Sequence, residues 1–237
     1  MHIAKDHDVR KAEFLDTAMS LFIERGYDDT SVNAIIEAVG VSKGAFYHYF
    51  RTKEELLDEL AARAGEQAMA IVEPIVSEPG VPAVDKMNAM FARTNAFKAQ
   101  NRELMLTLAR VFYSDRNALL RSRMTRRSVE LTAPALARII EQGNREGTMA
   151  VGHPTQTAQM ILEFGATVVA GFAQRLDEID RDPAVGDELI LSMRVYTESV
   201  ERILGVAAGS LTLVDDSIVR IVRGYTTESN GGADDRS

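Results

Sequence analysis

The chain has 237 residues, a formal net charge of -8 and no cysteine. This length accommodates one unit of about sixty residues and one larger domain. The lack of cysteine excludes disulfide bonds and thiolate metal sites and fits a reducing compartment, so we expect a cytoplasmic protein. Because no signal-peptide pattern and no uncharged apolar run of about eighteen residues is present, we expect no membrane partner.

The first predicted helix carries an apolar stripe and ends near Arg25-Gly26-Tyr27. The stripe comprises Phe14, Leu15, Ala18, Leu21 and Phe22. Before it, donor atoms for a metal occur on His2, Asp6, His7 and Asp8, at a terminus that we expect to be frayed. These residues lack a defined ligand geometry, so we predict no metal site and no cofactor.

Two short helices separated by a glycine turn are predicted next. Thr30 is a suitable N-cap, and apolar residues follow it at helical spacing, namely Val32, Ile35, Ile36 and Val39. Gly40 tolerates the left-handed conformation that ends a helix, and Ser42 can cap the next one. The turn of three to four residues is that of a helix-turn-helix, which indicates DNA binding.

The second of these helices has one buried face. Phe46 and Phe50 lie four residues apart and are predicted to anchor it in a small core. Its other residues can donate to phosphate oxygens or base edges, or leave room for close approach. A capping box, Thr52 and Glu55, then predicts a further helix that starts at Lys53.

Several of these segments together resemble the N-terminal domain of the TetR family of transcriptional regulators, over about residues 9 to 60. They are residues 14–22, Arg25-Gly26-Tyr27, Thr30-Ser31-Val32, residues 40–44, residues 46–50 and residues 53–56. The resemblance implies an all-α protein with a helix-turn-helix DNA-binding domain (1–60) and a helical ligand-binding and dimerisation domain (61–224). The remaining tail (225–237) is polar, so we expect it to be disordered.

By this resemblance, Tyr47 and Lys53 are expected to contact DNA phosphates. Candidates for approaching base edges are Asn33, Ser42, Lys43, Gly44 and Ala45, while His48 and Tyr49 are expected at phosphates, and Thr30 and Ser31 complete the predicted interface. Residues 1–60 hold seven Lys and Arg against twelve Asp and Glu. Between Ser42 and Lys53, however, there are three basic residues and no acidic one, so the groove-facing element is locally basic.

Helical patterns continue along the rest of the chain. They cover residues 53–72 (stopped before Pro74), 83–99, 103–113, 117–142 (with Pro134 as a kink or a new start), 155–179 and 185–204. The apolar stretch after Gly205 is left without an assignment, an extra helix being one option. Six arginines at 110, 116, 121, 123, 126 and 127 form either an anion-binding or partner surface or a solvated helix face.

In the last helix, one stripe is predicted to form a two-fold dimer interface, as the family uses its last two long helices; ordinary core packing is the alternative. The stripe is Leu189, Met193, Tyr196, Val200 and Ile203. The family resemblance also implies a ligand cavity, and flexible methionines and aromatics suit an apolar effector. Its candidate lining, for which plain core is again the alternative, is Met87, Met90, Phe91, Met105, Phe112, Tyr113, Phe164 and Phe172.

The sequence therefore predicts a dimeric regulator, most often a repressor in this family, that binds a palindromic double-stranded DNA operator and is released by an unknown small-molecule effector. An enzyme that uses the helical domain is the first alternative; the chain lacks the common nucleophile, phosphate-loop and zinc motifs, and we expect no enzyme. A non-specific architectural DNA binder is the second alternative, and the acidic net charge disfavours it.

Overall fold

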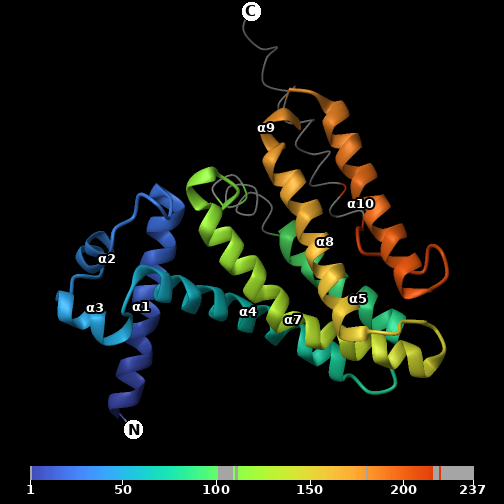
Figure 1. Ribbon diagram of the computed structural model, residues 1–237, viewed down its shortest axis with the longest axis horizontal. Coiled ribbons are helices and arrows are strands. Elements are labelled where there is room, and N and C mark those ends of the chain that lie inside the picture. Colours follow the sequence, from blue (N-terminus) through green and yellow to red (C-terminus); the bar gives the residue numbers. More distant parts are fainter. Residues whose placement is uncertain (1, 101–108, 110–111, 180, 216–218, 220–237) are drawn as a thin grey trace, which may run out of the picture. The chain divides into compact units, whose positions relative to one another are not determined.

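The structure is a computed structural model that describes residues 2–100, 109, 112–179, 181–215 and 219. Every regular element among these residues is helical, which confirms the all-α prediction (Figure 1). The chain forms two compact units: residues 1–67 with 108–128, and residues 68–107 with 129–237. Two helices, α4 (Lys53–Ser77) and α7 (Ala118–Glu146), contribute residues to both units.

The first unit contains α1 (His2–Arg25), α2 (Val32–Val39), α3 (Lys43–Tyr49) and the start of α4. Helix α1 already begins at His2, so it includes the residues for which a frayed terminus was expected. The core is built from the predicted stripe of α1, the inner faces of α2 and α3 and the first turns of α4 and α7. Its largest fully buried side chains are Phe14, Phe22, Ile35, Phe46, Phe50, Leu56, Leu57, Leu60 and Leu120.

Helix α2 is capped by Ser31, so the prediction of Thr30 as its N-cap is wrong. Ser31 has an extended backbone, and its Oγ accepts a hydrogen bond from the Ala34 amide at 3.1 Å. Thr30 is instead fully buried, and its hydroxyl donates to the Gly26 carbonyl at 2.7 Å. The hydroxyl therefore fastens the turn between α1 and α2 rather than the helix end.

The remaining boundaries of the helix-turn-helix confirm the sequence analysis. Gly40 ends α2 at φ 75°, in the left-handed region that favours glycine. Ser42 caps α3 by accepting from the Ala45 amide at 3.2 Å. At the start of α4, Thr52 Oγ1 accepts from the Glu55 amide at 3.1 Å, while the Glu55 carboxylate accepts from the Arg51 amide at 2.6 Å. The second bond of this capping box thus reaches one residue further back than expected.

The second unit packs the rest of α4 and α7 with α5 (Ala83–Gln100), α8 (Pro154–Gln174), α9 (Leu176–Ile179) and α10 (Pro183–Leu204). Helices α8 and α10 lie side by side (Figure 1). Fully buried residues at the centre of this core come from α5, α7, α8 and α10, namely Met87, Leu136, Ile139, Ile140, Ile161, Val200 and Leu204. None of the helices in the described part of the chain is long and apolar enough to cross a membrane.

Two prolines lie inside helices rather than at their ends. Helix α4 continues through Pro74 to Ser77, so the prediction that it stops before this proline is wrong. Likewise, α7 continues through Pro134. Proline removes one helical hydrogen bond, and here both rings are exposed while their neighbours, Val72 and Val76 or Ala133 and Ala135, are buried. The packing of the opposite face therefore holds each helix together.

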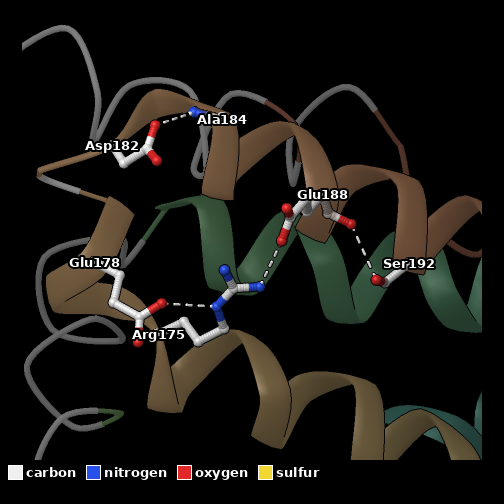
Figure 2. A network of polar contacts seen from close by, with 6 residues as sticks. All are labelled: Arg175, Glu178, Asp182, Ala184, Glu188 and Ser192. Atoms are coloured by element: carbon white, nitrogen blue, oxygen red, sulfur yellow. Dashed lines mark hydrogen bonds and ion pairs between the residues drawn. The ribbon is translucent and has the colours of Figure 1, made fainter.

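The predicted helix over residues 155–179 is divided at Arg175, where α8 ends and the short α9 follows. The Arg175 guanidinium donates to Glu178 and to Glu188 of α10, both at 2.9 Å (Figure 2). Asp182 caps α10 by accepting from the Ala184 amide at 3.0 Å. This polar network therefore joins the end of α8 to the start of α10.

After Gly205 ends α10 at φ 72°, residues 206–215 run without a helix along the second unit. Leu211 and Leu213 are buried in its core. Two asparagines of α5 hold this segment: Asn88 bonds to the backbone of Ser210 and Thr212, and Asn95 to that of Leu213 (2.8–3.1 Å). The apolar stretch over residues 206–215 is therefore packed against the second unit without forming a helix. The tail predicted at 225–237 lies outside the described residues.

Candidate nucleic-acid interface

Helix α3 exposes the face that the sequence analysis assigned to DNA. Ser42, Lys43 and Gly44 are exposed and Ala45 is partly exposed, whereas Phe46 and Phe50 are fully buried. The two phenylalanines thus fix the helix from behind. The polar and small residues at its start are left free to approach a nucleic acid.

The aromatic residues at the end of α3 differ in exposure. Tyr47 is exposed, with the Lys43 ammonium 5.9 Å from its ring centroid, and His48 is also exposed. Tyr49 is half-buried because its ring packs on Phe14 and on His7 of α1, with centroid distances of 5.6 and 4.6 Å. Tyr47 and His48 are therefore freer to reach a phosphate than Tyr49.

At the start of α2, Ser31 and Asn33 are exposed, so the Asn33 amide remains a candidate for reading a base edge. Ser31 already accepts a hydrogen bond as the cap, but a hydroxyl can still donate one. Thr30 has no exposed surface in this conformation, so its side chain cannot contact DNA.

Lys53, the predicted phosphate contact at the start of α4, is half-buried and already makes two hydrogen bonds. Its ammonium donates to the carbonyls of Tyr27 at 2.8 Å and Thr30 at 3.0 Å and lies 4.1 Å from the Tyr27 ring centroid. An ammonium has three donors, so one proton remains for a phosphate oxygen. Lys53 therefore has a structural role and stays a candidate for a DNA contact.

The charge of the first unit differs from that of residues 1–60 because residues 108–128 belong to it. Residues 1–67 hold eight basic and thirteen acidic residues, while residues 108–128 hold six arginines and one aspartate, so the unit has fourteen of each sign. Arg123 pairs with Asp58 at 2.9 Å, which directs part of this positive charge at the acids of α4. The unit is thus neutral, because the arginines of residues 108–128 offset the acidic excess of residues 1–67.

The predicted pocket residues do not gather in one core. Met87 and Met90 are buried in the second unit, with Phe91 packed beside them, whereas Phe112 packs against the core of the first unit, to which Tyr113 also belongs. On α8, Phe172 is half-buried and Phe164 is exposed, with its edge on Tyr196 at 5.1 Å. Met105 lies outside the described residues. The pocket therefore stays a prediction.

Four of the five residues predicted for a dimer interface are buried inside the chain. Leu189, Met193, Tyr196 and Val200 face the interior, and the Tyr196 hydroxyl donates to the Ile161 carbonyl of α8 at 3.1 Å. They form the intrachain core that was the alternative interpretation, and only Ile203 is exposed.

A different set of apolar side chains on the same two helices is exposed. It comprises Met160, Phe164 and Val169 on α8 and Leu191, Val195 and Ile203 on α10, with exposed fractions from 39% to 65%. Leu191, Val195 and Ile203 recur at multiples of four residues, so a second apolar stripe was present in the sequence. Periodicity alone does not tell which of two stripes faces inward.

Comparison with known proteins places the N-terminal helices in a known group. Residues 14–60 match the family described as bacterial regulatory proteins, tetR family. The HTH-type transcriptional repressor Rv1474c of Mycobacterium tuberculosis is 37% identical over 70 residues, which cover 29% of this chain and 37% of that protein. KstR2, an HTH-type transcriptional repressor of the same species, is 32% identical over 89 residues, or 38% and 44% of the two chains. The matches thus span less than half of either relative.

Among solved structures, the transcriptional regulator FadR from Bacillus subtilis, in complex with stearoyl-CoA, has a similar fold. The TM-score is 0.54, the sequence identity is 21%, and the match covers 78% of this chain and 95% of that one. Unlike the two sequence matches, this similarity extends through the second unit. At this identity it concerns the fold alone.

Proposed function

The chain belongs to the TetR family of bacterial regulatory proteins, and from this premise we propose that it is a sequence-specific, DNA-binding transcriptional repressor. The observation that carries the proposal is the exposed start of α3, Ser42 to Ala45, held from behind by the buried Phe46 and Phe50. This arrangement presents a recognition helix to the major groove. Both relatives named above are repressors, which supports repression rather than activation.

DNA contacts are proposed to come from the start of α2, from both ends of α3 and from the start of α4. Asn33 on α2 and Ser42, Lys43, Gly44 and Ala45 at α3 approach base edges, and Ser31 lies beside them. Tyr47, His48 and, to a smaller extent, Tyr49 contact phosphates, as does the third proton of Lys53. The neutral total charge of the unit favours binding only where several such contacts fit together.

The functional form is proposed to be a homodimer, because one helix-turn-helix reads few base pairs and a dimer reads two half-sites. The exposed apolar residues of α8 and α10 supply the interface, in place of the buried stripe that the sequence suggested. Apolar side chains as exposed as Met160 and Leu191, 65% and 57%, are stabilised when a second copy removes them from water.

A small-molecule effector is proposed to bind the second unit and to release the DNA. The complex of B. subtilis FadR with stearoyl-CoA shows that a protein of this fold holds a ligand, and its similarity to this chain does not identify the effector. An effector can shift the operator affinity only by its differential affinity for the two states of the regulator. An enzymatic role of the helical unit and non-specific DNA binding are the competing functions.

The first experiment is selection of DNA by the purified full-length chain from a random library. We expect enrichment of a palindromic sequence, with an affinity that falls by orders of magnitude when the sequence is scrambled. The affinity should also fall steeply with salt, because each phosphate contact releases counterions. Equal binding to all sequences would support an architectural protein, and a lack of binding at low salt would contradict the proposal.

A further inference from the structure

A single asparagine joins the segment before α7 to the turn between α1 and α2, within the first unit. Asn117, at the end of the 3-10 turn η1 (Asp115–Asn117), is only 1% exposed. Its Oδ1 accepts from the Tyr27 amide at 2.7 Å, and its Nδ2 donates to the Phe22 carbonyl at 3.3 Å. One amide side chain thus holds both the end of α1 and the turn that follows.

The residues on both sides of Asn117 also lie close to the first helices of the unit. The Arg116 carbonyl accepts from the Asp28 amide at 3.3 Å. Gly26, at φ 95°, lies so near Arg116 that a Cβ placed on it would be 2.9 Å from the Arg116 Cβ. Leu120, three residues after Asn117, is buried in the core of the first unit. This approach needs a glycine at position 26, because a larger residue would push the two segments apart.

The turn held by Asn117 also fixes the ammonium of Lys53. The Tyr27 amide donates to Asn117, while the Tyr27 carbonyl accepts from Lys53 at 2.8 Å, and the Tyr27 ring lies under the same ammonium. Hydrogen bonds therefore run from Asn117 through one residue to Lys53. A lysine side chain is long and flexible, and its head keeps one position only while these acceptors stay in place.

We infer that Asn117 is a positioning residue for DNA binding: it places Tyr27 and thereby the Lys53 ammonium, so that the start of α7 controls the operator affinity. Helix α7 begins at Ala118, directly after Asn117, and continues into the second unit as far as Glu146. A change along α7 that withdraws Asn117 would release the turn and with it one phosphate contact. The inference rests on the proposed function and adds a route of regulation to it.

The test measures binding to the selected operator as a function of salt for Asn117→Ala, Lys53→Ala, the double variant and Asn95→Ala. Asn95 is the matched control, since it is a buried amide bonded to a backbone carbonyl in the second unit. We expect Asn117→Ala to weaken binding by the same factor as Lys53→Ala and to lower the salt slope by about one unit. The double variant should bind no more weakly than Lys53→Ala alone, and Asn95→Ala should keep the wild-type slope.

An Asn117→Ala variant with an unchanged salt slope, or effects that add in full to those of Lys53→Ala, would overturn the inference and leave Asn117 a purely structural residue. Should Asn117→Ala not fold, amide hydrogen exchange of the unaltered chain decides. Operator binding should then slow exchange of the Tyr27 amide more than that of the Leu211 amide, which bonds to the Glu201 carboxylate at 3.0 Å in the second unit. Equal slowing would overturn the inference, whereas a wild-type chain that selects no DNA sequence would overturn the proposed function itself.

Discussion

At the scale of single residues, Tyr27 organises the turn between α1 and α2, but its hydroxyl lowers the stability of the fold. Its backbone and ring organise the turn, but its buried hydroxyl has no hydrogen-bond partner among the described residues. A buried polar group without a partner costs about 1–3 kcal/mol. We therefore expect Tyr27→Phe to raise the free energy of unfolding by about 1 kcal/mol at neutral pH. Urea denaturation of both proteins measures this, and a loss of stability would contradict it.

The same hydroxyl makes stability depend on alkaline pH. Burial, together with the nearby Glu54 carboxylate, raises the pKa of Tyr27 from 10.0 to about 12. As the pH rises, the unfolded chain loses this proton before the folded chain does. The contribution of Tyr27 to the free energy of unfolding is therefore fully present below pH 10.0 and decreases as the pH rises towards about 12. Denaturation curves across this range should show a smaller decrease for Tyr27→Phe than for the wild type. Equal decreases would show that other groups account for the loss.

Lys43 offers a contrast to Lys53, since it lies exposed at the first position of α3. If it reads a base edge, Lys43→Ala should weaken binding to the operator by about 1–3 kcal/mol and relax the base preference at one position of each half-site. If it contacts only phosphate, binding should weaken equally on all sequences. Repeating the selection with the variant separates these outcomes, and an unchanged affinity would remove Lys43 from the interface.

At the scale of elements, the boundaries set by local chemistry were predictable and those set by packing were not. Gly40 and Ser42 end and start helices through their own conformation and hydrogen bonds, and the structure confirms both. Pro74 carries a helix-breaking signal, but the buried Val72 and Val76 on the other face override it. The break at Arg175 was likewise hidden, because its partner Glu188 lies thirteen residues away.

In the candidate site, too, features set by local sequence were predictable and features set by long-range contacts were not. The inward anchors Phe46 and Phe50 followed from a four-residue spacing in a short helix with one apolar face. Helix α10 carries two apolar stripes, and the stripe that was predicted to form the dimer interface faces inward except for Ile203. The role of Asn117 was not found, because its partners Phe22 and Tyr27 are about ninety residues away, and periodicity carries no information on such contacts.

Two glycines of α8 provide a matched test of packing. A Cβ on Gly165 would lie 2.8 Å from the Tyr196 hydroxyl oxygen, which is held by its bond to Ile161, whereas a Cβ on Gly171 would meet nothing within 4 Å. Gly165→Ala should therefore lower the free energy of unfolding by about 1–3 kcal/mol through overpacking. Gly171→Ala should raise it by about 0.5–1 kcal/mol, because alanine favours a helix. Thermal and urea denaturation of both variants and the wild type, at one protein concentration, measure these changes. Changes of the same sign in the two variants would contradict the packing described.

At the scale of the whole molecule, α4 and α7 are the two described helices that pass from one unit to the other. The first begins with Lys53 and the second directly after Asn117, and both residues hold the same turn through Tyr27. A change in the second unit can therefore reach the same set of hydrogen bonds through either of these two helices. Such convergence makes the turn at Tyr27 sensitive to changes in either helix.

The proposed dimer depends on the exposed apolar residues of the second unit. Leu191→Asp places a charge at a side chain that is 57% exposed in the single chain, so it should leave the fold intact. In a dimer the charge would be removed from water without a partner, which is strongly unfavourable. We expect the variant to be monomeric by analytical ultracentrifugation and to lose most of its operator affinity. Leu119→Asp, at an exposed leucine of the first unit, is the control and should remain dimeric. A dimeric Leu191→Asp protein would place the interface elsewhere.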